Sequence, residues 1–374
     1  MLGQKHIPSG EGGIEVVVEE LATRMAALGH SLTCLDRRGH HIAGKYYDSD
    51  KTGKYRGVFI RDVPTINRRG FAAVSSSISA AFIAAIGPYD IVHFHAEGPA
   101  LMCFIPKIFG KKVVVTIHGL DWKRAKWGRL SRAYIKLGEW AAAKFSDGII
   151  VLNRDTKLYF ERRYNRDTVY IPNGVSLPSL RAPDIIKEKW GLDKEGYILF
   201  LGRLVPEKGI HLLIRAFMDT DTKKKLVIAG AGSDTRQYVK KLRDMADERV
   251  IFTGFVQGEE LFELYTNAYI YCLPSELEGM PMSLLEAMSY GNCCLVSDIP
   301  ECLDVVEDKG ISFRNKDVED LKLKLCELIR DRDRVHRLKD ASSSFICEKY
   351  KWDEVVRSTL ELYKRAESGA KRVK

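Results

Sequence analysis

The sequence predicts an α/β protein that contains two doubly wound parallel sheets. Along its 374 residues, apolar runs typical of buried strands alternate with helical segments in two successive series, a pattern typical of parallel sheets with helices on both faces. The polar stretch VSLPSLRAPD, which contains two prolines, separates the series like a linker between domains. A chain of this length also suits two domains better than one. We therefore expect Rossmann-like domains at 1–175 and 176–352.

The strands are expected where the apolar runs are most continuous. In the first series they are 32–35, 58–63, 91–95, 113–117 and 149–152, and in the second 197–201, 226–229, 250–252, 269–273, 294–297 and 311–313. Ligands of such sheets gather beyond the carboxyl ends of the strands. The residues that follow each run are therefore the first candidates for a site.

A glycine pair stands at the start of the first expected helix. The apolar positions from Ile14 onward share one helical face as far as Gly29, so Gly12 and Gly13 lie at the helix N-terminus. Exposed amides there suit a phosphate or a sugar, although a tight turn explains the pair equally well. A strand should lead into this loop, yet two residues precede Gly3. Either the first strand is very short or the natural gene starts upstream.

Composition indicates a soluble protein of the cytosol. Hydrophobic residues make up 45% and charged residues 29%, as in globular proteins. No apolar run reaches the roughly 18 residues that span a bilayer, and no signal peptide is evident. The eight cysteines lack CxxC spacing, so we expect reduced core residues rather than disulfides or metal ligands.

The net charge of +9 is concentrated in the first half. Residues 1–175 hold 26 Lys/Arg against 16 Asp/Glu, and 176–374 hold 33 against 34. A basic half attracts nucleic acid, an anionic membrane or a phosphorylated acceptor, and a solvated surface is the plain alternative. Within it, WKRAKWGRLSRAYIKLGEWAAAKF places Trp122 and Trp127 among cations such as Lys123, Arg124 and Arg129. This pattern favours an anionic lipid surface, with nucleic acid or an ordinary covering helix as alternatives.

Three histidines follow or end expected strands of the first half. His93 and His95 share a strand face, but no further ligand pattern indicates a metal, so packing or hydrogen bonding is expected. His118 ends a very apolar strand and precedes Gly119. Its ring is therefore expected to face the ligand crevice, with a purely structural hydrogen bond as the alternative.

The stretch EGMPMSLLEAMSYG, 278–291, is the strongest feature of the second half. It follows a buried strand and begins a helix near Met282, so helix N–H groups favour an anion beyond the strand. Glu278 and Glu286 flank this position, and carboxylates accept hydrogen bonds from sugar hydroxyls better than they bind phosphate. A nucleotide sugar satisfies both requirements.

A second motif supplies cations. GRLVPEKG follows the first strand of this half and places Arg203 and Lys208 around a turn, where they could neutralise a diphosphate. FTGFV places Gly254 at another strand end, where a flat base could stack. The fragment GAGSD lacks the full GxGxxG fingerprint, which makes NAD binding improbable.

Asp-x-Asp pairs that could hold Mg²⁺ or Mn²⁺ on a diphosphate occur three times. They are Asp48/Asp50, Asp219/Asp221 and Asp331/Asp333. None directly follows an apolar strand, so a solvent-exposed role is expected.

Together, GEGGIE, TIHG, IPNGV, GRLVPEKG and EGMPMSLLE resemble, in this order along the chain, the motifs of the retaining family-4 glycosyltransferases with the GT-B fold. The chain departs from the family pattern at its start, where the first strand is normally longer. The resemblance implies two Rossmann-like domains that face each other across a cleft. It also implies that the helix at about 353–366 returns to the first domain.

The resemblance also implies roles for individual residues. Glu278 would contact the donor sugar, Glu286 the ribose, and Arg203 and Lys208 the diphosphate, with His118 against the transferred sugar. The catalytic set is then Glu278, His118, Arg203 and Lys208, the donor-binding set is Gly12, Gly13, Arg203, Lys208, Gly254, Val256, Glu278, Gly279, Met280, Pro281 and Glu286, and Glu301 lies near the cleft. The family needs no metal, so no cofactor is expected.

The expected function is transfer of a sugar from a nucleotide donor to a lipid-linked or polysaccharide acceptor in cell-surface glycan synthesis. A UDP-sugar is favoured, and GDP- or dTDP-sugars remain open. We expect a cytoplasmic protein at the inner face of the membrane, without nucleic acid as partner. A nucleotide-sugar epimerase of the same fold and a non-catalytic binding module are the alternatives.

Overall fold

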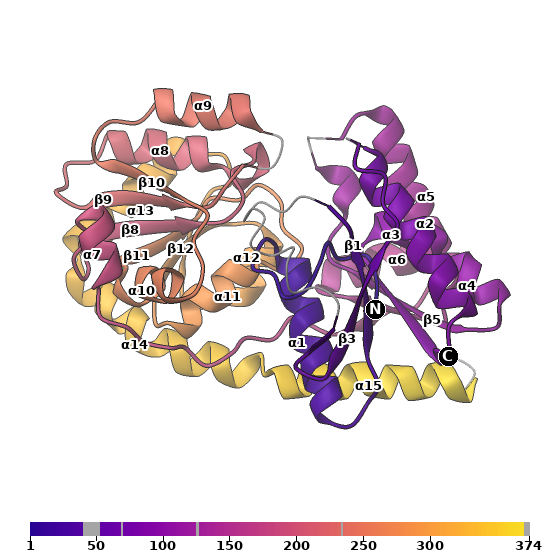
Figure 1. The fold of residues 1–374 in the computed structure, drawn as a ribbon. Helices are drawn as coiled ribbons and strands as arrows, with labels where there is room; N and C mark the ends of the chain where they lie inside the picture. Colours follow the sequence, from indigo (N-terminus) through magenta and orange to yellow (C-terminus); the bar gives the residue numbers. More distant parts are fainter. Residues whose placement is uncertain (40–52, 69, 125–126, 233–234, 370–374) are drawn as a thin grey trace. The chain divides into compact units, whose positions relative to one another are not determined.

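The computed structural model describes residues 1–39, 53–68, 70–124, 127–232 and 235–369 (Figure 1). These residues form two compact units. The first comprises Met1–Gly174 together with the chain from Trp352 onward, and the second is Val175–Lys351. Each unit is an α/β structure built on parallel strands, which confirms the predicted fold class.

The first unit combines a sheet with helices on its faces. Its elements are α1 (Gly13–Ala27), β1 (Thr33–Arg37), β2 (Lys54–Tyr55), β3 (Val58–Val63), α2 (Phe71–Ile86), β4 (Ile91–His95), α3 (Glu97–Ala100), the 3₁₀ helix η2 (Leu101–Cys103), α4 (Phe104–Ile108), β5 (Lys112–Ile117), η3 (Asp121–Lys123), α5 (Arg129–Phe145), β6 (Gly148–Val151), α6 (Arg154–Tyr164), β7 (Val169–Tyr170) and α15 (Trp352–Ser368). Among the described residues, β1, β3 and β2 form one group of paired strands, and β4, β5, β6 and β7 form another. All pairs are parallel except that between β2 and β3.

Leu2 joins the two groups of strands. It forms parallel bridges to Leu35 of β1 and Phe94 of β4, and its N–H donates to the carbonyl of His93 at 3.0 Å. The strand expected before the glycine-rich loop is thus represented by a single bridging residue. A cavity of about 670 Å³ lies beside it, lined by residues such as Thr33, Ile91 and Tyr363.

Valine and isoleucine fill the centre of this sheet. Val113, Val115 and Ile117 of β5 and Val151 of β6 are fully buried, because helices cover both faces of a parallel sheet and leave no polar side. The C-terminal helix α15 packs against α1, β5 and β6 of the same unit.

The second unit contains a single parallel sheet. Its elements are α7 (Ile185–Trp190), β8 (Tyr197–Leu201), η4 (Pro206–Lys208), α8 (Ile210–Met218), β9 (Lys225–Ala229), α9 (Arg236–Asp244), β10 (Val250–Gly254), α10 (Glu259–Asn267), β11 (Ile270–Leu273), α11 (Met282–Ser289), β12 (Cys293–Ser297), α12 (Pro300–Val306), β13 (Ile311–Phe313), α13 (Val318–Arg330) and α14 (Arg332–Lys349). Within the described residues the strand order is β10, β9, β8, β11, β12, β13. The chain moves outward from β8 in one direction and from β11 in the other. The carboxyl ends of β8 and β11 therefore form the topological switch point, where such sheets bind ligands.

The expected strands agree with the observed ones to within one or two residues at each end. The sequence did not reveal β2 and β7, which are two residues long each and pair with β3 and β6, because such short segments carry no periodic pattern. The predicted helix start near Met282 is confirmed by α11.

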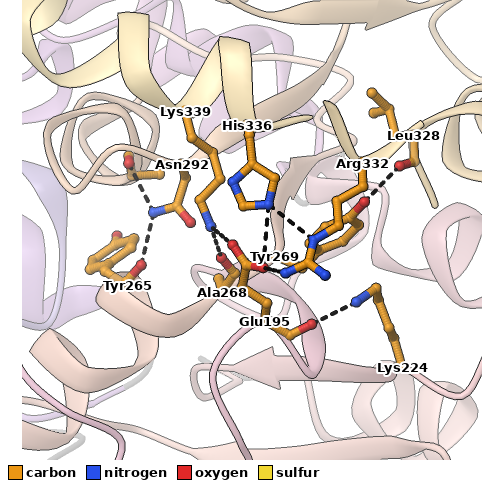
Figure 2. A network of polar contacts seen from close by, with 11 residues as sticks. Glu195, Lys224, Tyr265, Ala268, Tyr269, Asn292, Leu328, Arg332, His336 and Lys339 are labelled. Atoms are coloured by element: carbon orange, nitrogen blue, oxygen red, sulfur yellow. Dashed lines mark hydrogen bonds and ion pairs between the residues drawn. The ribbon is translucent and has the colours of Figure 1, made fainter. Parts of the chain in front are cut away.

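A network of ion pairs and hydrogen bonds (Figure 2) lies at the amino end of the second sheet, opposite the carboxyl ends of its strands. Glu195 lies in the turn before β8 and accepts from Lys339 at 3.0 Å and from Arg332 at 3.1 Å, both on α14. Its backbone carbonyl accepts from Lys224 at 2.7 Å. Burial tends to raise the pKa of Glu195, but the cations led by Lys339 bring it below its usual value. The network joins α14 to the sheet, remote from the carboxyl ends of the strands.

The cysteines are free thiols, and six of the eight are buried. Among the described residues, no helix combines the length and apolarity needed to cross a bilayer.

Candidate functional site

The loop after β8 brings two cations to the switch point. Arg203 is half-buried in this loop, and Lys208 ends the short helix η4 with 9% of its surface exposed. Gly209 follows at φ 65°, and a Cβ there would lie 1.9 Å from the carbonyl oxygen of Pro274 in the loop after β11. Only glycine allows this approach, so the motif GRLVPEKG is packed directly against the loop that carries Glu278.

Lys208 and Glu278 form an ion pair across these two loops. Lys208 Nζ contacts Glu278 Oε1, and the side chains are 11% and 8% exposed. Glu301 lies at the start of α12, next to the buried Cys302, whose thiol pKa is raised well above its usual value by burial and then by the charge of Glu278. The structure thus brings together two residues predicted from separate motifs, Lys208 and Glu278.

The second glutamate of the motif lies one turn into α11. Glu286 is half-buried, and its Oε2 accepts a hydrogen bond from the phenol of Tyr265 at 2.8 Å. Burial, and then the charge of Glu286, hold the pKa of Tyr265 well above its usual value, so the phenol remains a donor. The residues between the glutamates, Gly279, Met280 and Pro281, are buried.

Tyr271 connects the strand ends beneath this loop. Its hydroxyl contacts Ser283 Oγ at 2.8 Å, in the first turn of α11, and the carbonyl of Leu201 at 3.3 Å, at the end of β8. Both Glu278 and Glu286 act on its pKa, which burial raises well above the usual value. Tyr265 thus supports Glu286 from the buried side, and Tyr271 joins the first turn of α11 to the end of β8; the sequence motifs did not predict either tyrosine.

The ends of β9 and β10 leave backbone exposed. Gly254 ends β10 at φ 77°, and a Cβ there would meet open space. Gly230, after β9, approaches the carbonyl of Gly202 so closely that a Cβ would lie 1.9 Å from it. Val256 is buried beyond Gly254. Without side chains in the way, this edge can accept a flat ring, as the sequence predicts for Gly254.

The glycine pair of the first unit begins α1. Gly12 is the N-cap and Gly13 the first helical residue. Glu15 reaches back over this end: it accepts from the N–H of Lys5 at 3.0 Å, and a Cβ on Gly12 would lie 2.6 Å from Glu15 Oε2. This bond goes to Lys5, outside the helix, and not to the N-cap N–H that a capping glutamate accepts from. The N-terminus of α1 therefore already faces one negative charge.

His118 follows β5 and adjoins the two histidines of β4. Its Nε2 lies 3.1 Å from His95 Nδ1, while His93 contacts Tyr363 of α15 at 2.6 Å and Thr116 at 2.7 Å. The rings of His93 and His95 stack with centroids 4.2 Å apart. Burial lowers the pKa of His118 to about 4, so the ring is neutral at physiological pH. His93 and His95 thus take the packing and hydrogen-bonding roles expected of them.

The loop after His118 is fixed by buried carboxylates. Glu97 accepts from the N–H of Asp121 at 2.7 Å, and Glu139 accepts from Trp122 Nε1 at 3.0 Å. Trp122 therefore packs inward, whereas the sequence suggested that it lies at a lipid surface. Arg124 pairs with Asp121 at 2.6 Å, and Lys126 lies outside the described residues.

The remaining motifs lie elsewhere. Asp219 ends α8 and contacts Lys322, and Asp331 caps α14 through the N–H of Arg334. The pair Asp48/Asp50 and the end of GAGSD lie outside the described residues. In the part of the chain that the structure describes, no group of three or more His, Cys, Asp or Glu side chains has the arrangement of a metal site.

Comparison with known proteins identifies the class. The family model Glycosyltransferase Family 4 matches residues 11–178, and Glycosyl transferases group 1 matches 183–345. The fold is also that of a solved glycosyltransferase. The chain belongs to the family-4 glycosyltransferases with the GT-B fold.

Individual relatives match at lower identity. An uncharacterized glycosyltransferase of Methanocaldococcus jannaschii is 34% identical over 180 residues, 46% of each chain. The UDP-Gal:α-D-GlcNAc-diphosphoundecaprenol α-1,3-galactosyltransferase of Escherichia coli is 27% identical over 62% of this chain and 64% of its own length. Among solved structures, HepE of Anabaena in complex with UDP and glucose superposes with a TM-score of 0.80 at 15% identity, covering 97% of this chain and 98% of that one.

Proposed function

We propose that this glycosyltransferase moves a sugar, with retention of anomeric configuration, from a nucleoside diphosphate donor to a lipid-linked glycan acceptor. A UDP-sugar is the favoured donor, and GDP- or dTDP-sugars are the alternatives. The observation that carries the proposal is the Lys208–Glu278 pair at the switch point of the second unit. It joins a cation suited to a diphosphate with an acceptor suited to sugar hydroxyls.

Each part of the donor then has its own residues. Arg203, Lys208 and the N-terminus of α11 hold the diphosphate, Glu278 binds hydroxyls of the sugar, and Glu286 binds the ribose. Gly254 and Val256 border the base. In the first unit, His118 contacts the transferred sugar and Gly12 and Gly13 offer amides to the phosphates. Because cations and helix N–H groups neutralise the diphosphate, the reaction needs no metal.

The reaction follows from where charge develops. The anomeric carbon loses its bond to the phosphate oxygen and gains one to the acceptor oxygen, and the acceptor proton passes to the departing phosphate. Negative charge grows on the diphosphate as that bond breaks. Arg203, Lys208 and the helix N-terminus stabilise it, an effect typically of several kcal/mol.

The outer face of α5 supports a membrane-bound acceptor. Leu130, Leu137 and Trp140 are 89%, 52% and 46% exposed. The exposed cations of the same helix are Arg129, Arg132, Lys136 and Lys144. Its single acidic residue, Glu139, is buried. Exposed apolar and cationic side chains without exposed carboxylates suit an anionic lipid surface, and the galactosyltransferase relative is named for a diphosphoundecaprenol substrate. Association with the inner face of the membrane is part of the proposal.

The test is an assay with a panel of UDP-, GDP- and dTDP-sugars and a polyprenyl-diphosphate glycan in vesicles, with and without EDTA. The expected result is transfer from one donor, unchanged by EDTA, with the anomeric configuration retained. Donor conversion to an epimer without acceptor would indicate an epimerase instead. Absence of binding and of hydrolysis across the whole panel would refute the proposal.

A further inference from the structure

His95 is completely buried on β4 and lies between two other histidine rings. His93 stacks on it with centroids 4.2 Å apart, and His118 lies 5.3 Å away with the ring planes 32° apart. Burial lowers the pKa values of His93 and His95 well below their usual range, and that of His118 to about 4. All three rings are therefore neutral, and each carries one hydrogen on one of its two nitrogens.

The contact between His95 and His118 contains a single hydrogen. Nδ1 of His95 lies 3.1 Å from Nε2 of His118, so one of these nitrogens donates and the other accepts. Two arrangements satisfy this requirement. They place the remaining hydrogen of His118 differently: in one, Nδ1 of His118 is a donor, and in the other it is an acceptor.

The far side of His95 selects between them. Nε2 of His95 is buried and has no hydrogen-bond partner among the described residues. A hydrogen on that nitrogen would be an orphaned buried N–H group, which folded proteins avoid more strictly than an unused acceptor. The hydrogen of His95 is thus expected on Nδ1, directed at Nε2 of His118.

We propose that His95 is a positioning residue that fixes His118 as the tautomer with its hydrogen on Nδ1, and so makes His118 a donor to an oxygen of the transferred sugar. Donation from His118 to the sugar rests on the proposed function. The tautomer of His118 is a property of the substrate-free protein, because the three rings belong to one compact unit. Among the described residues, the bond to His95 is the hydrogen bond that the His118 ring makes, which leaves Nδ1 for a ligand.

The test uses two isosteric replacements of opposite chemistry. In His95→Asn the amide NH₂ lies near the position of Nδ1 and still donates, whereas in His95→Asp the carboxylate only accepts. Tyr363→Phe is the matched control, because it removes the 2.6 Å contact to His93 but leaves the His95–His118 contact. Circular dichroism and melting temperature establish that each variant is folded.

The first readout is the tautomer of His118, from long-range ¹H–¹⁵N spectra of protein labelled at histidine and assigned with His118→Ala. The expected result is a hydrogen on Nδ1 in the wild type, His95→Asn and Tyr363→Phe, and on Nε2 in His95→Asp. A wild-type hydrogen on Nε2, or the same tautomer in His95→Asp as in the wild type, would overturn the proposal.

The second readout is the division of the effect between kcat and KM. We expect His95→Asp to lower kcat by about tenfold or more, the equivalent of one lost hydrogen bond, with the donor KM within about threefold, and His95→Asn to restore most of kcat. Equal kcat in wild type and His95→Asp, with the tautomer switched, would refute donation to the sugar. If the wild type transfers no sugar from any donor while the spectra behave as expected, the proposed function fails and the tautomer assignment stands.

Discussion

Lys208 and Glu278 neutralise each other in the substrate-free protein, although their proposed ligands differ. The pair joins the loop after β8 to the loop after β11, and both side chains are about nine-tenths buried. A diphosphate that draws Lys208 away from Glu278 would leave this carboxylate to accept from sugar hydroxyls. Sugar and diphosphate are therefore expected to bind cooperatively, because each compensates for one half of the broken pair.

Removal of one partner of this pair should cost more stability than removal of both. Lys208→Met removes the cation that is paired with the largely buried carboxylate of Glu278, and we expect a loss of about 1 to 3 kcal/mol in the free energy of unfolding. The double variant with Glu278→Gln should recover at least half of that loss. Urea denaturation measures both values. A double variant as unstable as the sum of the single variants would contradict the pairing.

Tyr265 should affect nucleotide affinity through Glu286. Tyr265→Phe removes the 2.8 Å hydrogen bond, and we expect affinity for the donor's nucleoside diphosphate to fall by about three- to tenfold. Tyr269→Phe is the matched control, because that hydroxyl donates to Leu328 at 3.0 Å, at the other end of the strand. Calorimetric titration of both variants gives the comparison, and equal affinities would contradict a role for Tyr265.

Asp36 should make stability depend on pH near neutrality. Burial raises the pKa of this carboxyl to about 7, although it accepts from the N–H of Ile7 at 2.8 Å and from Gln4 at 2.9 Å. Since the folded protein holds the proton more tightly than the unfolded chain, this group's contribution is complete below about pH 4 and is lost as pH rises through 7, by at most about 4 kcal/mol. Unfolding free energies of wild type and Asp36→Asn from pH 4 to 8 test this. Parallel curves would contradict it.

The contribution of Glu195 to stability depends on pH in the opposite direction to that of Asp36. Its pKa is lowered by Lys339 and the neighbouring cations against the effect of burial, so its contribution is present at neutral pH and is lost as pH falls below the usual carboxyl range through the folded value. Glu195→Gln should destabilise the protein by about 1 to 3 kcal/mol at pH 7 and leave donor affinity unchanged, because the network lies at the amino end of the sheet (Figure 2). A large change in donor affinity would contradict that placement.

Vesicle binding should depend on α5. Arg129, Arg132 and Lys136 changed together to Gln should weaken binding to vesicles rich in phosphatidylglycerol by about tenfold or more, at about 1 kcal/mol per cation. The matched control changes Arg236, Lys240 and Lys241 of α9, which are equally exposed but lie on a helix without exposed large apolar residues. Sedimentation with vesicles measures both. Equal loss in the two variants would indicate a general charge effect.

The sequence predicted most of what depends on contiguous residues. Runs such as 91–95 and 197–201 are strands as expected, because apolar β-branched segments carry the signal of a buried parallel sheet. The motif residues Lys208 and Glu278 meet because each follows a strand of one sheet. The supporting residues were not predictable in this way. Tyr265 and Glu286, or His95 and His118, are more than 20 positions apart, and a single sequence contains no signal that pairs them.

Two further differences between the sequence predictions and the structure have local causes. Glu15 lies against the glycine pair at the N-terminus of α1, because its carboxylate accepts from the N–H of Lys5, which is 10 residues away in the chain. The basic neighbours of Trp122 in the sequence predict that it lies on a surface that faces lipid. Its indole N–H instead meets the buried carboxylate of Glu139, which is 17 residues away in the chain.

The most direct measurement is the rate of sugar transfer by Glu278→Gln, with the affinity of the donor's nucleoside diphosphate measured on the same protein. If Glu278 binds the transferred sugar and the nucleotide is held by other groups, transfer should fall by about 100-fold or more, while nucleoside diphosphate affinity should not fall, because an amide does not compete with the diphosphate for Lys208. Transfer at the wild-type rate would contradict the central claim that the Lys208–Glu278 pair marks the site of glycosyl transfer.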